Sequence, residues 1–467
     1  MKEKLKAVPA WAAAITFLFL IACVTFMTVG LKTPPHIPLL ISAVAAAGVG
    51  AACHFRWSEM QEGILDTTRP AIPAVLIIMT IGLLIGAWMA GGIIPSMIYY
   101  GLQIISPRFF LVTALLLCSV VSLAVGSSLS TIGTVGVALF GIGSALGVPP
   151  AMTAGAIVSG AYFGDKMSPL SDTTNLAPSV SGADLFDHIR HMMVTTLPSY
   201  LISLLLFGIL GFCFTSGGEA GTGIAEIMAV LRENFRISPL LLLPPLAVIL
   251  MVVFRIPALP GLLFAAGLGM VCALLFQEGN TLAGMFQILM NGYAGSTGSE
   301  TVDTLLNRGG LMGMMKTVAL ILISLGFAGI FERTGMAEAL VRKILSRVRG
   351  DRGLVIATVL TSWMILLGTG QQYVAIIMTG RLFQSVYRER GLLPCNLSRA
   401  LEDAGTVFGG IVPYSTGAGF TENALGVSAW QYGPFTFFGW INPLVSIALA
   451  AMGKSISRIP DGKKEGA

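Results

Sequence analysis

Six long stretches without a single charged residue constrain the fold of this chain more than any other feature of its sequence. Each is at least as long as the ~20 apolar residues that a helix needs to cross a lipid bilayer. The stretches are 70–107, 109–164, 192–218, 256–277, 353–380 and 423–453. Hydrophobic residues make up 55% of the chain and charged residues only 11%, against roughly 25% in an ordinary soluble domain. The sequence therefore predicts an all-α membrane protein that crosses the bilayer many times.

The first apolar run, Ala10–Val29, follows Lys2, Lys4 and Lys6 in the manner of a secretory signal. The run is longer than the apolar part of a typical signal, and no convincing small-residue cleavage site ends it, so we expect an uncleaved first span. The net charge of +5 comes from residues that lie mainly in the connecting segments. This distribution indicates loops beside a membrane and argues against a nucleic-acid partner.

An internal correspondence at a constant offset of 244 residues predicts a repeat. Isolated glycine matches mean little in a chain with 56 glycines, but the matching glycines and prolines recur in the same order within similar hydropathy. The matched pairs include Gly126 and Gly370, Pro150 and Pro394, Pro169 and Pro413, and Ser171 and Ser415. We predict a first repeat over 1–215, a connecting loop over 216–238, a second repeat over 239–455 and a cytoplasmic tail over 456–467.

Each repeat contains three conventional spans, an apolar segment with a small polar tip, a helix interrupted in its middle, and a final span. The polar tips are Gly126–Thr131 and Gly368–Tyr373, and the arms around the first tip are too short for two comfortable crossings. We therefore expect two re-entrant hairpins and two broken helices. An odd number of crossings in each repeat places the second repeat in the membrane upside down, which gives two inverted repeats and about ten transmembrane helices.

Basic residues provide the orientation. In this topology most lysines and arginines, among them Arg342, Lys343, Arg388 and Lys454, fall on the side of both termini. By the positive-inside rule we expect both termini in the cytoplasm and the chain in the inner (cytoplasmic) membrane.

The segment Gly164–Asn175 is the most unusual part of the sequence, because Pro169 interrupts a helix among hydroxyl, amide and carboxyl groups. Irregular backbone at membrane depth is tolerated only where it is buried in protein or lines a wet cavity, so this break predicts a binding site. Alternatively, Asp165 and Lys166 lie at a solvated helix end, and Asp172 caps the second half-helix. The candidate binding residues are Asp165, Ser168, Ser171, Asp172, Thr173 and Asn175 in the break, with Ser128, Ser130 and Thr131 in the first tip.

The matching break, Gly409–Gly419, offers hydroxyls and backbone but no carboxylate, so the two halves are not equivalent. Glu402, Asp403 and Glu332 are possible coupling residues; alternatively, the first two pair with Arg399 on their own helix, and Glu332 sits at a helix end beside Arg333. The second set of candidate binding residues is Thr369, Gln371, Gln372, Ser415 and Thr416. We expect His188 and His191, which flank Arg190, at the surface.

Four motifs carry a resemblance to a known family. They are GAYFGDKMSPLSDTTNLAPSVSGADLFDHIRHM from Gly160, NRGGLMGMMKTV from Asn307, GTGQQYVAIIMTGRLF from Gly368 and NLSRALEDAGTV from Asn396. With them the chain resembles the NhaC family of sodium/proton antiporters over nearly its whole length. The resemblance implies the ion-transporter superfamily fold, with hairpin tips and broken helices meeting near the bilayer midplane. It also implies exchange of sodium for protons and, in some members, of carboxylates such as malate and lactate. The departure is Gln371, where members often carry an acid in GTGDQY.

We therefore expect a secondary transporter, without enzymatic activity or cofactor, that exchanges sodium ions and protons by alternating access. A hard cation prefers oxygen ligands, and Asp172, Ser171, Thr173 and Asn175 form the candidate sodium set. Desolvation favours the protonated form of a buried carboxyl group, so protons and sodium contest it. The alternative is a carrier of a small carboxylate or amino acid, favoured by the amides of Gln371, Gln372 and Asn423. A homodimer is possible in either case.

Overall fold

A computed structural model describes residues 8–214, 220–254 and 256–459, and the regular secondary structure of this part of the chain is helical apart from one isolated bridge between Leu392 and Arg458. Eight helices among the described residues are long and apolar enough to cross a membrane, and the bent pair Ala429–Phe435 and Phe437–Met452 makes up to a ninth. The first candidate span, Ala10–Gly30, coincides with the run that we expected to be an uncleaved span. The expectation of an all-α membrane protein is confirmed.

The helices follow one another with short connections. In chain order they are α1 (Ala10–Thr25), α2 (His36–Ala52), α3 (Trp57–Thr68), α4 (Ile72–Ala90), α5 (Ile93–Ile104), α6 (Phe110–Val125), α7 (Ser128–Thr131), α8 (Val137–Ala145), α9 (Pro150–Met167), α10 (Asp172–Ser181), α11 (Leu185–Phe214), α12 (Ala220–Asn234), α13 (Leu243–Val253), α14 (Ala258–Phe276), α15 (Leu282–Asn291), α16 (Glu300–Leu306), α17 (Leu311–Arg333), α18 (Met336–Leu345), α19 (Gly350–Thr369), α20 (Gln372–Glu389), α21 (Pro394–Leu401), α22 (Thr416–Leu425), α23 (Ala429–Tyr432) and α24 (Phe437–Met452).

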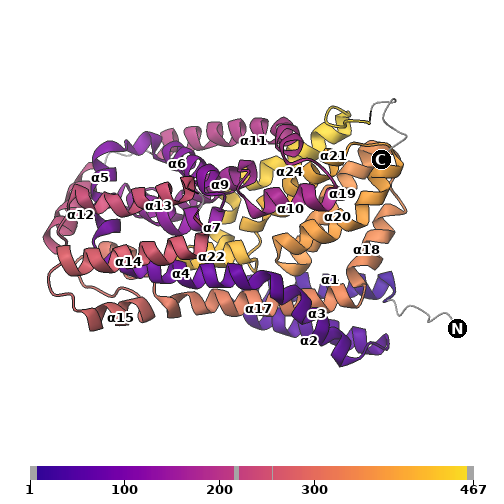
Figure 1. The fold of residues 1–467 in the computed structure, drawn as a ribbon, viewed down its shortest axis with the longest axis horizontal. Helices are drawn as coiled ribbons and strands as arrows, with labels where there is room; N and C mark the ends of the chain where they lie inside the picture. Colours follow the sequence, from indigo (N-terminus) through magenta and orange to yellow (C-terminus); the bar gives the residue numbers. More distant parts are fainter. Residues whose placement is uncertain (1–7, 215–219, 255, 460–467) are drawn as a thin grey trace.

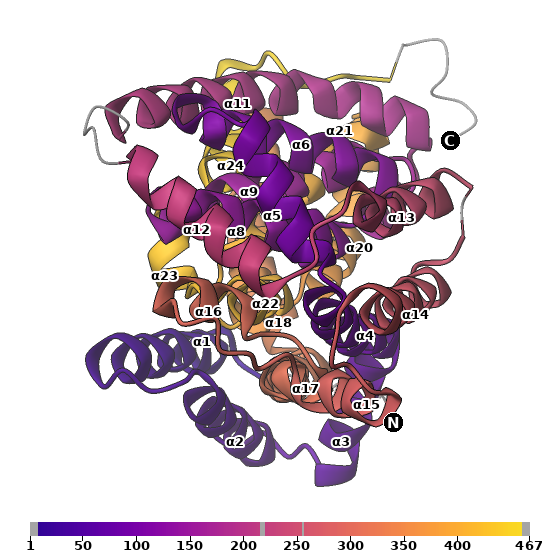
Figure 2. The ribbon, with the colours of Figure 1, turned by 90° about the vertical axis from the view of Figure 1, so that its left-hand side faces the viewer.

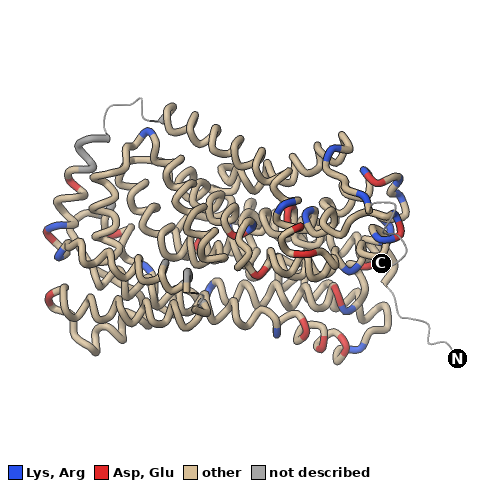
Figure 3. Tube along the Cα trace, turned by 45° about the horizontal axis from the view of Figure 1, so that its top comes forward, with Lys and Arg blue, Asp and Glu red and all other residues tan. Residues whose placement is uncertain are grey.

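The long helices run mostly along the long axis of the molecule, and the chain enters α1 and leaves α24 at the same end (Figure 1). Seen from the opposite end, α1, α2, α3 and α17 lie on one side, α11 and α24 lie on the other, and α9 and α22 lie between them (Figure 2). Charged residues gather toward the ends of the molecule, but a group of both signs also lies in its interior (Figure 3). The interior group and the two central helices are where the candidate site is found.

Helix α11 illustrates why the outside of the molecule is apolar. It lies along one edge of the molecule (Figure 1), and large apolar side chains follow one of its faces at a spacing of four residues. Leu197, Leu201, Leu205 and Ile209 are all exposed. Such a stripe, without charge, is what a helix presents to lipid rather than to water.

Two small residues let α6 and α9 pack at very short range. A Cβ atom on Gly160 would lie 2.3 Å from the carbonyl oxygen of Leu115, and one on Gly164 would lie 2.4 Å from that of Ser119. The hydroxyl of Ser122 donates a hydrogen bond of 2.6 Å across the same interface to the carbonyl oxygen of Ala161. This contact fixes the end of α9, and with it Asp165, against the helix that leads into the first polar tip.

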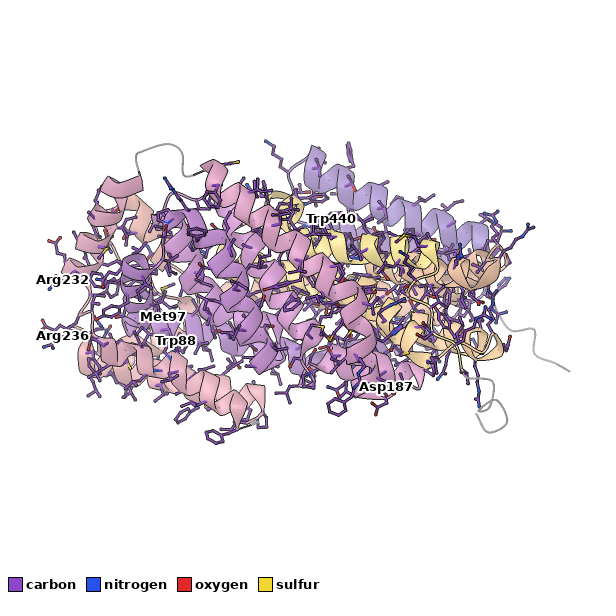
Figure 4. The ribbon with its side chains drawn as sticks, turned by 90° about the horizontal axis from the view of Figure 1, so that it is seen from above. Trp88, Met97, Asp187, Arg232, Arg236 and Trp440 are labelled. Carbon is purple, nitrogen blue, oxygen red and sulfur yellow. The ribbon has the colours of Figure 1, made fainter. Side chains whose placement is uncertain are left out.

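The segment expected as a connecting loop, 216–238, is largely helical, because α12 occupies Ala220–Asn234. Residues 216–219 lie outside the described part of the chain. Ile227, Leu231 and Phe235 follow one another at a spacing of four and are buried, so an apolar face holds this segment against the helices beneath it. Figure 4 shows Arg232 and Arg236, from the end of this segment, at one end of the molecule.

Candidate functional site

The first polar tip begins with a glycine in the left-handed conformation. Helix α6 ends at Val125 and is followed by Gly126, whose φ is +68°. Ser127 then caps α7, because its hydroxyl accepts a hydrogen bond of 3.3 Å from the backbone N–H of Ser130. A Cβ atom on Gly126 would lie 2.7 Å from the carbonyl carbon of Leu170. Glycine is therefore required at this position for two reasons: its backbone conformation, and the close contact between the tip and the break that follows α9.

The break after α9 places the start of α10 beside the first polar tip. Helix α9 ends at Met167, and α10 begins at Asp172, directly after the N-cap Ser171, whose hydroxyl accepts a hydrogen bond of 3.4 Å from Thr174 N–H. The capping role considered for Asp172 thus belongs to Ser171. Asp172 is the first residue of the half-helix, where the partial positive charge of the helix start stabilises a carboxylate.

The second half of the chain builds a similar pair of elements. Helix α19 ends at Thr369 and is followed by Gly370, with φ of +66°, and α20 begins at Gln372. A π segment, Glu402–Thr406, and a 3-10 turn, Val407–Gly410, lead into the second break. Helix α22 follows the break and starts at Thr416, directly after the N-cap Ser415. Tip and break touch directly, because the backbone N–H of Thr416 donates a hydrogen bond of 3.3 Å to the carbonyl oxygen of Gly370.

These two tips and two breaks meet around a cavity of about 70 Å³, which we call the central cavity. Asp165 lines it and accepts hydrogen bonds from both the hydroxyl and the backbone N–H of Ser128, at 2.7 and 3.1 Å. Gln371 lines it from the other half, with its amide oxygen 2.9 Å from the donating hydroxyl of Thr416. The predicted residues at this cavity are Ser128, Asp165, Ser171, Asp172, Thr173, Gln371, Gln372 and Thr416.

Two larger cavities adjoin the central cavity through shared residues. One, of about 260 Å³, also contacts Gly126, Ser127 and Asp172 and holds Ser130 among apolar side chains of α13 and α14. The other, of about 470 Å³, also contacts Gln371 and Tyr373 and contains Asp66, Glu332 and Arg381. Glu332 therefore lies beside the central cavity rather than in it.

Comparisons with known proteins identify the family of the chain. Residues 160–454 match the profile of the Na+/H+ antiporter family. The chain is 39% identical over 428 residues to a protein of Alkalihalophilus pseudofirmus named Na(+)/H(+) antiporter NhaC, with 92% of each chain covered. The chain belongs to the Na+/H+ antiporter family.

Two further relatives come from Bacillus subtilis. The protein named Na(+)/H(+) antiporter NhaC is 38% identical, with 94% of this chain and 97% of that one covered. The protein named malate-2H(+)/Na(+)-lactate antiporter is 34% identical, with 93% of each chain covered. The family resemblance of the sequence motifs is confirmed.

In this member of the Na+/H+ antiporter family, the other predicted residues hold the backbone of their own segments. Asn175 donates hydrogen bonds of 2.8 and 2.7 Å to the carbonyl oxygens of Pro169 and Ser171, so its amide nitrogen fixes the first break. The remaining ones are Thr131, which donates to Ser127, Ser168, which accepts from Leu170, Thr369, which donates to Ile365, and Ser415, which donates to Gly409.

A second buried polar group, which we call the charge cluster, lies behind the central cavity and consists of Lys166, Arg399, Glu402 and Asp403. The ammonium group of Lys166 lies 2.7 Å from the carboxylate of Asp403, and neither side chain has any exposed surface. The alternative of a solvated helix end for Lys166 is therefore wrong. Arg399 approaches the other oxygen of Asp403 at 3.6 Å, as the spacing of four residues suggested.

Asp403 also accepts hydrogen bonds of 2.9 Å from Thr195 and from Asn442, so groups from three other helices converge on one carboxylate. Glu402 is fully buried, and neither of its carboxylate oxygens has a hydrogen-bond partner among the described residues. The charge cluster thus connects both breaks, because Lys166 follows Asp165 directly in the chain while Asp403 lies in the π segment before the second break.

The expectation of a surface position is wrong for His188, which is fully buried and lies 2.8 Å from the hydroxyl of Ser398. His191 is partly buried. Neighbouring charges suggested a solvated loop, but both histidines belong to α11, which packs against α21. The sequence also gave no reason to select Tyr162, whose hydroxyl accepts a hydrogen bond of 3.2 Å from Gln372, because its partner is 210 residues away.

Proposed function

We propose that this chain exchanges Na+ for H+ across the cytoplasmic membrane by alternating access, with the central cavity as its cation site. Membership of the Na+/H+ antiporter family supports the exchange. The observation that carries the assignment of the site is that both polar tips and both helix breaks contribute to a single small cavity, whose carboxylates are Asp165 and Asp172.

The size and lining of the cavity favour a small cation. About 70 Å³ accommodates a sodium ion with little water, and the lining offers carboxylate, hydroxyl and amide oxygens, the ligands that hard cations prefer. The sodium set Asp172, Ser171 and Thr173 lies here, with Asn175 holding the break that presents it. Two carboxylates in one cavity also repel an anionic substrate.

The proton coupling that we propose involves Glu402 as well as Asp165. A charged carboxylate without hydrogen-bond partners is costly in a buried site, so Glu402 is suited to carry a proton. Lys166 is already paired with Asp403, and through its neighbour Asp165 it connects the cavity to the charge cluster. We therefore infer that Asp403 positions Lys166 and that Glu402 exchanges the proton; Glu332, in the adjoining cavity, lies on the path by which ions enter.

The finer architecture that we propose is two inverted repeats with re-entrant hairpins at the tips, ten crossings and both termini in the cytoplasm. The offset of 244 residues supports the repeat, because it relates the starts of structural elements as well as sequence letters. It pairs the starts of α9 and α21 (Pro150 and Pro394), the starts of α10 and α22 (Asp172 and Thr416), and the left-handed glycines Gly182 and Gly426.

A second candidate function is exchange of a small carboxylate. The 470 Å³ cavity next to Gln371 contains Arg381 and is large enough for an organic acid, and one relative is named a malate/lactate antiporter. Reconstitution in liposomes separates the two functions. A sodium gradient should change the internal pH without any organic solute, whereas a pH change that appears only after malate or lactate is added would refute the simple Na+/H+ exchange.

A further inference from the structure

A separate cavity of about 580 Å³ lies between α17, α22 and the segment that joins α1 to α2. It is larger than the central cavity, and the two share no lining residue. Gly419 and Glu422 of α22 line this cavity, and they lie about one turn beyond Thr416 and Gly417, which line the central cavity. We call the separate cavity the lysine cavity.

Two lysines from different elements line this cavity. Lys316 lies in the second turn of α17, inside a candidate membrane span, and is exposed. Neither it nor Lys32 has an ion-pair partner among the residues that the structure describes. A lysine near the end of a span keeps its ammonium group at the interface, and without an ion-pair partner that group is available to a ligand.

The backbone at Lys32 adds an independent observation. Its φ is +54°, in the left-handed region that residues other than glycine rarely adopt, and Pro34 and Pro35 stiffen the segment directly after it. Unusual backbone of this kind persists where the surrounding structure determines it, often at ligand sites. Here it places a lysine at the rim of a cavity that already contains a second lysine.

The remaining lining decides the sign of the charge that fits. Glu422 is the acidic residue of the lining, so the charged side chains leave a net positive charge. Gln431, Ser428 and Trp430 add polar and aromatic surface on the side of α22 and α23. Lysines bind carboxylate and phosphate oxygens as point charges, and hydroxyl and amide groups complete such sites.

We propose that the lysine cavity binds an oxyanion, either a small carboxylate or phosphate solute or the headgroup of an anionic lipid, at a site independent of the cation exchange. The groups that bind it are the ammonium groups of Lys32 and Lys316. Glu422 opposes them and limits the affinity. The ligand bridges α17 and the segment after α1 to α22.

The test uses the whole protein in nanodiscs of phosphatidylcholine and measures the binding of radiolabelled succinate and of inorganic phosphate. Lys316→Gln and Lys32→Gln should each weaken binding about five-fold, ~1 kcal/mol for one charge at close range near water. Glu422→Gln should strengthen binding, because it removes a like charge from the anion's surroundings. The matched control is Arg232→Gln, an exposed basic residue on α12 that does not line the cavity and should change nothing.

A second arm distinguishes the two sources of the oxyanion. If the ligand is a lipid, succinate and phosphate bind weakly or not at all, whereas phosphatidylglycerol in the disc raises the unfolding temperature of the wild type but not of Lys32→Gln or Lys316→Gln. The proposal is overturned if no anion and no anionic lipid responds to the lysine substitutions, or if Glu422→Gln weakens binding. Asp172→Asn, which is expected to stop the exchange, should leave this binding unchanged, so failure of the cation site and failure of the lysine cavity are separable.

Discussion

Removing Asp403 from the charge cluster should destabilise the protein more than any change at its surface. The Asp403→Asn substitution leaves the ammonium group of Lys166, which has no exposed surface, without the carboxylate that lies 2.7 Å from it. Breaking a buried pair on one side typically costs 3–5 kcal/mol, because an uncompensated charge remains in a medium of low dielectric. Arg399, whose guanidinium has unpaired N–H groups, would lose its partner at 3.6 Å as well. We therefore expect a loss of about 4 kcal/mol in the free energy of unfolding.

A matched control separates the cost of breaking this buried pair from the cost of an ordinary polar substitution. Arg342 and Glu338 form an ion pair at 2.6 Å on α18, with 76% and 46% of their side chains exposed. Glu338→Gln should cost about 0.5 kcal/mol or less, because water and salt screen such a pair. The assay is thermal unfolding followed with a thiol-reactive dye, since Cys118, Cys272 and Cys395 are buried and free.

The double variant Lys166→Met/Asp403→Leu completes the cycle. Replacing both members of a buried pair with apolar residues is often neutral for stability. The double variant should therefore be more stable than either single variant and still fail to exchange ions. If Asp403→Asn unfolds at the same temperature as Glu338→Gln, or if the two single effects simply add, Lys166 and Asp403 do not stabilise the fold as a pair.

The other predictions concern the cavity and the topology. Asp172→Asn should abolish sodium-dependent proton exchange in liposomes while the protein still inserts and unfolds at the wild-type temperature, and Asp165→Asn should cause a severe loss; full activity in Asp172→Asn would exclude it as a shared ligand. Gln371→Glu adds a carboxylate 2.9 Å from the Thr416 hydroxyl, so it should raise sodium affinity in a cation exchanger and cripple a carboxylate carrier; unchanged sodium affinity and organic-acid uptake would place Gln371 outside the site. Single cysteines at Glu278 and Arg349, both exposed, should label from outside and inside respectively in an otherwise cysteine-free protein; the opposite pattern would reverse the orientation. Gly126→Ala should cost at least ~1–2 kcal/mol of stability, since φ is +68° and the new methyl group meets Leu170; an unfolding temperature equal to that of wild type would contradict this contact.

Local signals in the sequence were sufficient to find the segments that build the central cavity. Proline and glycine mark where helices stop, and an apolar chain has few reasons to keep such breaks unless they line a cavity. Residue type and position therefore predict Asp165 and Ser128, the family resemblance adds to the case for Gln371, and the structure brings all three to one cavity. The same reasoning did not separate ligands from backbone supports: Asn175 and Ser168 have the right chemistry, but their hydrogen bonds lie within the break.

Long-range pairing was the part that the sequence could not supply. The partner of Lys166 lies 237 residues away and that of His188 lies 210 residues away, so the neighbouring residues alone indicate a solvated helix end and a surface histidine. An ionisable residue near Arg or Lys in the sequence gives the same local pattern whether its side chain is buried or exposed. Only the packing of α9 and α11 against the second half of the chain decides between the two.

The two halves contribute different chemistry to the central cavity, and this difference has a mechanistic consequence. The first break provides carboxylates directly at the cavity, at Asp165 and Asp172, whereas the second provides hydroxyl and amide groups there and keeps its own carboxylates, Glu402 and Asp403, in the charge cluster behind it. A cation in the proposed site would thus contact carboxylates of the first half and neutral oxygen atoms of the second half. In the mechanism that we propose, a movement of the first break releases the cation and also changes the surroundings of Glu402, because Lys166 follows Asp165 and pairs with Asp403. Sodium release and proton uptake need not occur at the same carboxylate, provided that the buried Lys166–Asp403 pair moves in both events.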